Sequence, residues 1–223
     1  MQRVINDRKV AIVGCGFVGS ATAFALMQSE LFTEMALIDV DRDRAEGEAL
    51  DIAHGMPLRR PHEHLAALRR RGRCGHHHRH GRREPATRRN APGLVHKNVS
   101  IFKSIIPEIA HRDYQGILLV VSNPVDILTH VALKLSGMPE NRVIGSGTVL
   151  DTARFKYILG EHLGVDPRNV HARIIGEHGD SELAGMERAN AVRHPLDHFC
   201  EAAGYYEHDK ADECSSGGAG QRL

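Results

Sequence analysis

Apolar and polar positions are arranged along the chain in blocks that predict an α/β protein. The short runs 10–13 and 35–38 are uninterrupted by polar residues, which is typical of strands buried in a parallel sheet. Two similar runs lie at 116–121 and 143–145. In 99–110 the apolar residues recur at helical spacing, so this helix should bury one face. Strands that alternate with helices in this way predict a Rossmann-type doubly wound parallel sheet.

The first predicted strand leads into a glycine-rich turn that contains Gly14, Gly16 and Gly19. Glycines at this spacing permit a tight turn and a close backbone approach to a pyrophosphate, which would lie at the N-terminus of the following helix. The second strand ends in Asp39, twenty residues after Gly19. A carboxylate there can bind both ribose hydroxyls and would repel a 2′-phosphate, so the pattern predicts NAD rather than NADP.

A second turn follows the run 116–121 and begins with Ser122 and Asn123. The carboxyl ends of parallel strands form the edge at which open α/β sheets bind their ligands. We therefore expect these two residues to lie beside the cofactor or the substrate.

Two stretches that are distant in the chain carry groups suited to proton transfer and carboxylate binding. His178 lies among small and acidic residues just after an apolar pair, and Asp151 and Arg154 follow the run 143–145. A histidine can exchange a proton near neutral pH, a carboxylate can fix its tautomer, and an arginine can bind a carboxylate bidentately. Together they suit oxidation of a 2-hydroxy acid, although a histidine near a strand end is by itself more often structural.

With these segments in place, the chain resembles the NAD-dependent L-lactate dehydrogenases of bacteria over residues 8–58, 94–184 and about 195–211. The sequence Gly-Glu-His-Gly-Asp-Ser-Glu around His178 is the lactate form of its motif, whereas malate enzymes of the superfamily usually lack that final glutamate. The sequence Ser-Gly-Thr-Val-Leu-Asp-Thr-Ala-Arg-Phe points the same way. The resemblance implies interconversion of L-lactate and pyruvate in fermentative glycolysis, with malate dehydrogenase as the alternative.

The resemblance also implies a role for each residue of the site. His178 would be the acid–base group on the reacting oxygen, Asp151 would orient it, and Arg154 would bind the substrate carboxylate. Asn123 would lie beside the nicotinamide and the reacting oxygen. The positions expected to bind the cofactor are Gly14, Gly16, Val18, Gly19, Asp39, Arg44, Ser122 and Asn123. No metal is expected.

Lys156 and His171 fall where allosteric bacterial members bind fructose 1,6-bisphosphate across a subunit interface. A lysine stands at 156 instead of the more usual arginine, so ordinary surface charge is the competing interpretation. By resemblance, the intact protein would be a cytoplasmic homotetramer. No run of eighteen apolar residues predicts a membrane span, and the first strand begins too early to leave room for a signal peptide.

Residues 59–93 depart from the family pattern, which would place here two strands and a mobile loop with a catalytic arginine. They contain eleven arginines, six histidines, two acidic residues, and neither lysine nor aromatic residues, for a net charge of +9. A nucleic-acid surface is one interpretation, but arginine without interleaved aromatic residues is a poor stacking surface, so we expect no nucleic-acid partner. A metal site at Cys74 and the nearby histidines is another, without further support.

A shifted reading frame is the interpretation that we favour for this segment. Read one base later, the codons of His76-His77-His78 permit three isoleucines, and those of 84–92 permit a sequence that contains Gly-Glu-Thr-Arg, the family's loop. The codons of 185–188 likewise permit Val-Trp-Ser-Gly, the family's usual continuation. The shift restores an apolar strand and the loop arginine, and it places glutamines where malate enzymes carry arginine.

These features predict an NAD-binding domain at 1–145, aberrant at 59–93, and a truncated α+β catalytic domain at 146–223. The serine- and glycine-rich residues 212–223 are expected to be disordered. An arginine-rich segment cannot replace a strand beside the first one, because burying unpaired guanidiniums is prohibitive. The chain as written is therefore expected to fold poorly and to be inactive; a noncatalytic remnant with a basic arm is the other alternative.

Overall fold

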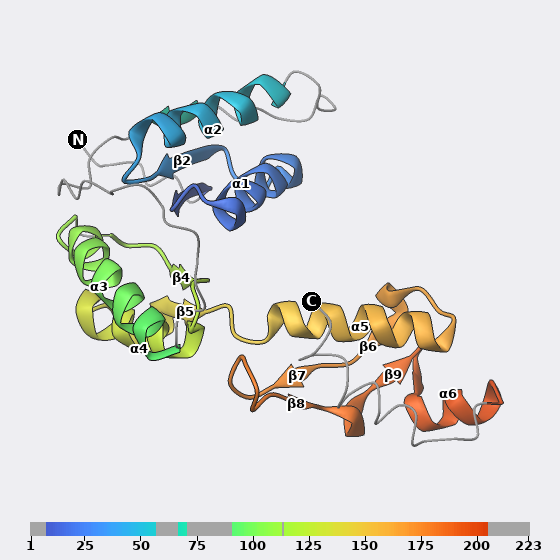
Figure 1. The fold of residues 1–223 in the computed structure, drawn as a ribbon. Helices are drawn as coiled ribbons and strands as arrows, with labels where there is room; N and C mark the ends of the chain where they lie inside the picture. The colour runs from blue at the N-terminus through green and yellow to red at the C-terminus, as the bar shows by residue number, and fades with distance from the viewer. Residues whose placement is uncertain (1–7, 57–66, 71–90, 113, 205–223) are drawn as a thin grey trace. The chain divides into compact units, whose positions relative to one another are not determined.

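The computed structural model describes residues 8–56, 67–70, 91–112 and 114–204 (Figure 1). The chain divides into two compact units, Met1–Pro85 and Ala86–Leu223, and each is described by itself. The tail 212–223, expected to be disordered, lies outside the described residues.

The N-terminal unit is a parallel sheet with two helices. Strand β1 (Lys9–Val13) leads through the glycine-rich turn into α1 (Phe17–Ser29), and β2 (Glu34–Ile38) is followed by α2 (Arg42–Gly55). The strands run parallel, and both end together because Val13 is paired with Ile38. The core between sheet and helices consists of Cys15, Ala23, Met27, Met35, Leu37, Ala49 and Ile52.

A third strand, β3 (Ala67–Arg70), lies inside the segment that the sequence marks as aberrant. It pairs in parallel with β2, so the order in this sheet is β1-β2-β3. Among the described residues, the other edge of β1 has no strand beside it. Within the described chain, four residues of the arginine-rich segment thus form a strand at the β2 edge of this sheet.

The C-terminal unit begins with a second small parallel sheet. Helix α3 (Ala91–Ala110) precedes β4 (Leu118–Val120), and α4 (Val125–Ser136) with the short helix η2 (Glu140–Arg142) connects it to β5 (Val143–Gly145). Strands β4 and β5 are parallel neighbours. Their buried residues pack with those of the helices in one cluster formed by Ile106, Val120, Val125, Leu128, Ala132 and Val143.

The rest of this unit is a helix packed against short antiparallel strands. Helix α5 (Val149–Leu163) is followed by η3 (Pro167–Asn169), by two small antiparallel sheets of three and two strands, and by α6 (Leu196–Ala202). The strands are β6 (Val170–His171), β7 (Ile174–Ile175), β8 (Leu183–Ala184), β9 (Asn190–Ala191) and β10 (His194–Pro195), with η4 (Met186–Arg188) after β8. Their shared core includes Phe155, Leu159, Leu163, Val170, Ile174 and Leu196.

The predicted strands and helices are confirmed, and β2 is buried as expected, with Met35, Ala36 and Leu37 at most 5% exposed. The same expectation is wrong for β1 and β4, because Val13 of β1 is 41% exposed and Leu119 of β4 is 59% exposed. Within the described chain, β2 has a strand on each side, whereas β1 pairs only with β2 and β4 only with β5. The boundary between the two compact units, after Pro85, falls inside the NAD-binding domain expected at 1–145. In the described segments, no helix is long and apolar enough to cross a membrane.

Candidate active site

The glycine-rich turn has the close backbone packing that its sequence predicts. Gly14 has φ of +101°, a conformation that favours glycine, and its N–H donates to the carbonyl oxygen of Ile38 at 2.7 Å. A Cβ on Gly19 would lie 1.9 Å from the carbonyl oxygen of Gly14, so no other residue fits there without opening the turn. At Gly16, by contrast, an added Cβ would meet open space. These contacts join β1, α1 and β2 in one rigid cradle.

Asp39 is placed at this cradle by backbone hydrogen bonds to both of its oxygens. Oδ2 accepts from the N–H of Cys15 at 2.6 Å, and Oδ1 accepts from the N–H of Asp41 at 2.9 Å. Burial, with the Asp39 carboxylate as a second cause, raises the pKa of the Cys15 thiol above 9.0. Arg44 lies in the first turn of α2, where its N–H donates to Asp41, while Val18 is exposed in the first turn of α1. The residues expected to bind the cofactor in this unit therefore surround one turn.

The second predicted turn begins directly after β4. Ser122 and Asn123 are both exposed there, and Asn98 of α3 donates from Nδ2 to the Asn123 carbonyl oxygen at 2.6 Å. This contact fixes the backbone of the turn and leaves both predicted side chains available to a ligand.

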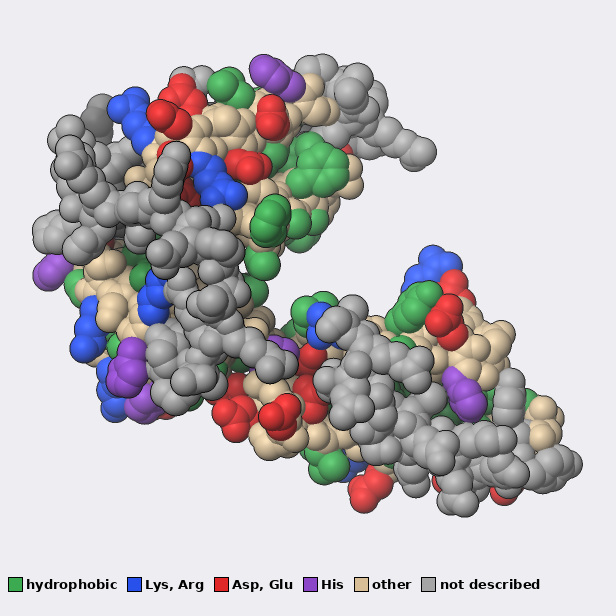
Figure 2. Space-filling view, viewed as in Figure 1, with side chains coloured by type: hydrophobic (Ala, Val, Ile, Leu, Met, Phe, Trp, Pro, Cys, Tyr) green, Lys and Arg blue, Asp and Glu red, His purple; other side chains and the backbone are tan. Residues whose placement is uncertain are grey.

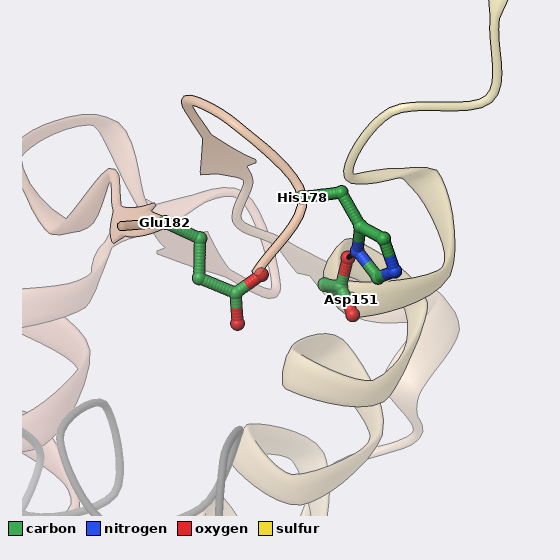
Figure 3. Close-up of side chains that lie close together, drawn as sticks. All are labelled: Asp151, His178 and Glu182. Atoms are coloured by element: carbon green, nitrogen blue, oxygen red, sulfur yellow. Dashed lines mark hydrogen bonds and ion pairs between the residues drawn. The ribbon is translucent and has the colours of Figure 1, made fainter. Parts of the chain in front are cut away.

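The second unit brings His178, Asp151 and Arg154 together, although 27 positions separate the histidine from the aspartate (Figure 3). His178 Nδ1 lies 2.6 Å from Asp151 Oδ2, and Arg154 Nη1 lies 3.4 Å from the other oxygen, Oδ1. Asp151 is buried, with 6% of its side chain exposed, whereas the side chains of His178 and Arg154 are 23% and 41% exposed. The carboxylate thus holds one imidazole nitrogen and leaves the other ring nitrogen and the guanidinium near solvent.

Hydroxyl groups of α5 hold the histidine loop in register with Asp151. The N–H of Ile174 donates to Thr152 Oγ1 at 3.0 Å, and Thr148 Oγ1 donates to the Ile174 carbonyl oxygen at 2.7 Å. From the other side, Asp126 of α4 accepts the backbone N–H of His178 at 3.1 Å. The pair is therefore positioned by α4, α5 and β7 together.

Glu182 is a further acidic group at this pair. Figure 3 shows its side chain extending from the loop between β7 and β8 toward Asp151 and His178. Its pKa is raised above the usual 4.5, first by desolvation and then by repulsion from Asp151, while the side chains of His178 and Arg154 act in the opposite direction.

The sequence interpretation gave no role to Thr148, Thr152, Asp126 or Glu182. A signal for the threonines was present, because Thr148, Asp151 and Thr152 are spaced to share one face of a helix. Asp126 and Glu182 depend on contacts across distant segments, for which the sequence carries no comparable signal. Lys156 lies partly buried on α5 and His171 lies exposed on β6, and no hydrogen bond joins them in the described structure.

Comparison with known families agrees with this geometry. The NAD-binding domain of lactate/malate dehydrogenases matches residues 8–69 and 80–145, and the α/β C-terminal domain of the same enzymes matches 148–215. The chain belongs to the lactate/malate dehydrogenase family. NAD is accordingly the cofactor of its N-terminal domain, as Asp39 predicts. The only residues that this match omits between 8 and 145 are 70–79, which include the histidine-rich part of the aberrant segment.

Individual relatives of this lactate/malate dehydrogenase family member are L-lactate dehydrogenases. The enzyme of Acetivibrio thermocellus is 50% identical over 205 residues, which are 87% of this chain and 62% of the relative. That of Moorella thermoacetica is 49% identical over 199 residues, 86% of this chain and 61% of the relative. The chain thus spans about three fifths of the length of these curated relatives.

Solved structures give the same fold. A lactate dehydrogenase from a deep-sea metagenome library aligns with a TM-score of 0.80 at 35% identity, over 95% of this chain and 68% of the other. The minor L-lactate dehydrogenase of Enterococcus mundtii aligns with the same TM-score at 36% identity, over 95% and 69%. The prediction of a Rossmann-type domain followed by an α/β catalytic domain is confirmed.

Proposed function

We propose that the protein is an NAD-dependent L-lactate dehydrogenase, which interconverts L-lactate and pyruvate. The observation that carries the proposal is the 2.6 Å contact between His178 Nδ1 and Asp151 Oδ2, with Arg154 on the opposite oxygen of the same carboxylate. This arrangement supplies a proton acceptor of fixed orientation beside a cation that can bind a carboxylate.

In this proposal each of these three residues has a separate task. Arg154 binds the carboxylate of lactate, and the free ring nitrogen of His178 takes the proton of the lactate hydroxyl as the C2 hydrogen leaves with its electron pair. Asp151 stabilises the imidazolium that results, because its buried carboxylate is already hydrogen-bonded to Nδ1. In the reverse direction, His178 returns the proton to the carbonyl oxygen of pyruvate.

Bound NAD⁺ supplies the hydride acceptor for this step. The cradle at Gly14, Gly16 and Gly19 fits the pyrophosphate, since only glycine can occupy position 19 against the Gly14 carbonyl. Asp39 would hold the ribose hydroxyls, and Asn123 would lie beside the nicotinamide.

The choice of lactate over malate rests on the names of similar curated proteins, which are L-lactate dehydrogenases. Glu182 completes the lactate form of the histidine motif.

The chain as written lacks one part that this chemistry needs, the loop arginine that the family supplies between residues 59 and 93. Loss of one group that stabilises developing charge typically costs about a hundredfold or more in turnover. We therefore propose that the written chain is inactive and that the shifted reading frame encodes the functional loop.

The test is to resequence the DNA for residues 55–95 and from 183 onward, and to assay two proteins. The first is the chain as written. The second carries the shifted-frame residues at 59–93 and 185–188 together with the complete C-terminal domain that the corrected reading frame encodes. We expect lactate-dependent formation of NADH only in the second, with pyruvate strongly preferred to oxaloacetate in reverse. The proposal would be overturned if the second protein is well folded but forms no NADH from lactate, or if it prefers oxaloacetate to pyruvate.

We further propose a cytoplasmic homotetramer in fermentative glycolysis, with Lys156 and His171 binding fructose 1,6-bisphosphate between subunits. What supports this is the position of both residues in the family pattern. Sedimentation of the restored protein should give a tetramer, and fructose 1,6-bisphosphate should lower the KM for pyruvate. His171→Gln should abolish that effect while leaving the activity without effector unchanged.

A further inference from the structure

We propose that Asp151, His178 and Glu182 form an inhibitory binding site for a divalent transition-metal ion, of which Zn²⁺ is the best fit. Each residue offers one ligand atom, and these three atoms all lie within 4.8 Å of one another. The residues come from two segments that the threonine contacts of α5 hold together, so the grouping is fixed by the fold.

Glu182 takes no part in the proton transfer or in the carboxylate binding of the proposed dehydrogenase reaction. In the described chain, its carboxylate forms no side-chain hydrogen bond or ion pair, although it is partly buried. Asp151 lies close enough to repel it. Figure 2 shows acidic side chains gathered over the loop between β7 and β8, which also carries Glu177 and Asp180. A cation placed between Asp151 and Glu182 would relieve this repulsion.

The donor set selects the class of metal. One imidazole nitrogen and two carboxylate oxygens are suitable ligands for Zn²⁺, whereas Mg²⁺ and Ca²⁺ prefer oxygen alone. With bonds of about 2.0–2.2 Å, tetrahedral ligands are roughly 3.4 Å apart. His178 Nδ1 and Asp151 Oδ2 are only 2.6 Å apart, so a metal bound to both would replace their contact and separate them, while the partly exposed Glu182 side chain would move by on the order of 1 Å to close the site. Two carboxylates and a neutral imidazole also balance the charge of the metal.

The consequence is inhibition by competition for the acid–base pair. A metal held by His178 and Asp151 removes the proton acceptor and the carboxylate that orients it, and it places a positive charge beside Arg154. Metal and substrate cannot then use the site together. The ligands are in the proposed catalytic pair, but metal binding itself requires neither lactate nor NAD.

The experiment measures Zn²⁺ binding to the full chain by competition with a chromophoric chelator, and Co²⁺ binding by its visible absorption. Because the histidine-rich tract could bind Zn²⁺ independently, the parent protein carries serine in place of Cys74, His76, His77, His78 and His80. The test variants are Glu182→Gln and His178→Asn. Glu177→Gln is the matched control, since Glu177 lies on the same loop but outside the cluster.

We expect Glu182→Gln and His178→Asn each to weaken one Zn²⁺ site at least tenfold and to remove the intense Co²⁺ bands, while Glu177→Gln binds as the parent does. Circular dichroism establishes that each variant is folded like the parent. Equal Zn²⁺ affinity in the parent and both test variants would overturn the proposal. Because the readout is metal binding, that outcome would leave the dehydrogenase proposal standing.

Discussion

Asp151 gives each of its two carboxylate oxygens a different partner, His178 on one side and Arg154 on the other. A buried carboxylate is costly unless its oxygens are satisfied, so both contacts stabilise the fold as well as orient the site. At the scale of single residues, the neighbouring Thr152 is one of the groups that align the pair. Its hydroxyl accepts the backbone N–H of Ile174, four positions before the histidine.

Thr152→Val tests this dependence. Valine keeps the shape of threonine but leaves the N–H of the buried Ile174 without an acceptor, which costs about 1–3 kcal/mol. We expect the urea midpoint of the C-terminal unit to fall accordingly. Thr129→Val is the control, because its hydroxyl bonds only to a helical carbonyl within α4. Equal midpoints for the two variants would contradict the role of Thr152.

Gly19→Ala tests the cofactor turn at the same scale. The added Cβ would lie 1.9 Å from the Gly14 carbonyl oxygen, so the turn must open. We expect a lower melting temperature for the N-terminal unit and loss of NADH binding, measured by NADH fluorescence. The control is Gly47→Ala within α2, where an added Cβ meets nothing within 4 Å. Because alanine is the better helix former, the control variant should gain about 0.5–1 kcal/mol of stability. If the control loses as much stability as Gly19→Ala, the steric explanation is wrong.

Residue types with distinctive chemistry could be identified from sequence, and generic ones could not. His178, Asp151 and Arg154 were predicted as a group, and the structure brings them together. Thr152 and Asp126 act through backbone contacts that become visible only when β7 and α4 are placed beside them. Their side chains are common on any helix surface, so their types alone predict nothing.

At the scale of elements, short connections depend on local caps. Asp166 precedes η3 and links α5 to β6; its carboxylate accepts the Arg168 N–H at 2.8 Å and pairs with the guanidinium at 2.7 Å. The side-chain bond from Arg168 is the main cause that lowers the pKa of Asp166 from its usual 3.8 to about 2. The ionised form is therefore favoured by folding.

Because the folded pKa is the lower one, the Asp166 carboxylate stabilises the fold above pH 3.8, and this contribution is lost as the pH falls toward 2. Asp166→Asn should lower the melting temperature at pH 7, and the deficit should shrink below pH 3.8. Thermal melts of both proteins over this pH range provide the measurement. A deficit that stays constant from pH 7 to pH 3 would indicate that the charge is not involved.

Elements were predictable where the signal is local. The apolar runs located β1, β2 and β5, and helical spacing located α3. Strand burial was not predictable in this way, because it depends on what covers each face. Periodicity alone also gave β4 as six residues, whereas hydrogen bonding to β5 extends only over Leu118–Val120.

At the scale of the whole molecule, the described parallel strands form separate sheets, β1-β2-β3 in one unit and β4-β5 in the other. Leu119 of β4 and its register partner Ile144 of β5 are both exposed large apolar residues. In a doubly wound sheet, helices cover both faces. We expect the apolar strand encoded in the shifted frame to pair beside β1 and to form one continuous sheet whose faces the helices cover.

Leu119→Ala distinguishes the two forms of the protein. In the chain as written, this exposed side chain should contribute less than about 0.5 kcal/mol to the free energy of unfolding. In the frame-restored protein the same change should cost about 2–5 kcal/mol, because the side chain becomes buried. Val120→Ala is the control, since Val120 is already buried and should destabilise both proteins. Urea unfolding measures all four variants; a small effect of Leu119→Ala in both backgrounds would argue against a restored sheet.

The threonine contacts between α5 and β7 affect how a damaged dehydrogenase gene would be classified from the structure of its product. Every group that aligns His178 with Asp151 lies in 126–174, beyond the segment 59–93 in which the written chain departs from its relatives. Mutations that destroy the loop or a central strand therefore leave the acid–base geometry in place. A survey that accepts an enzyme on the geometry of its catalytic pair would count such pseudogene products as active, and the continuity of the sheet is the more demanding criterion.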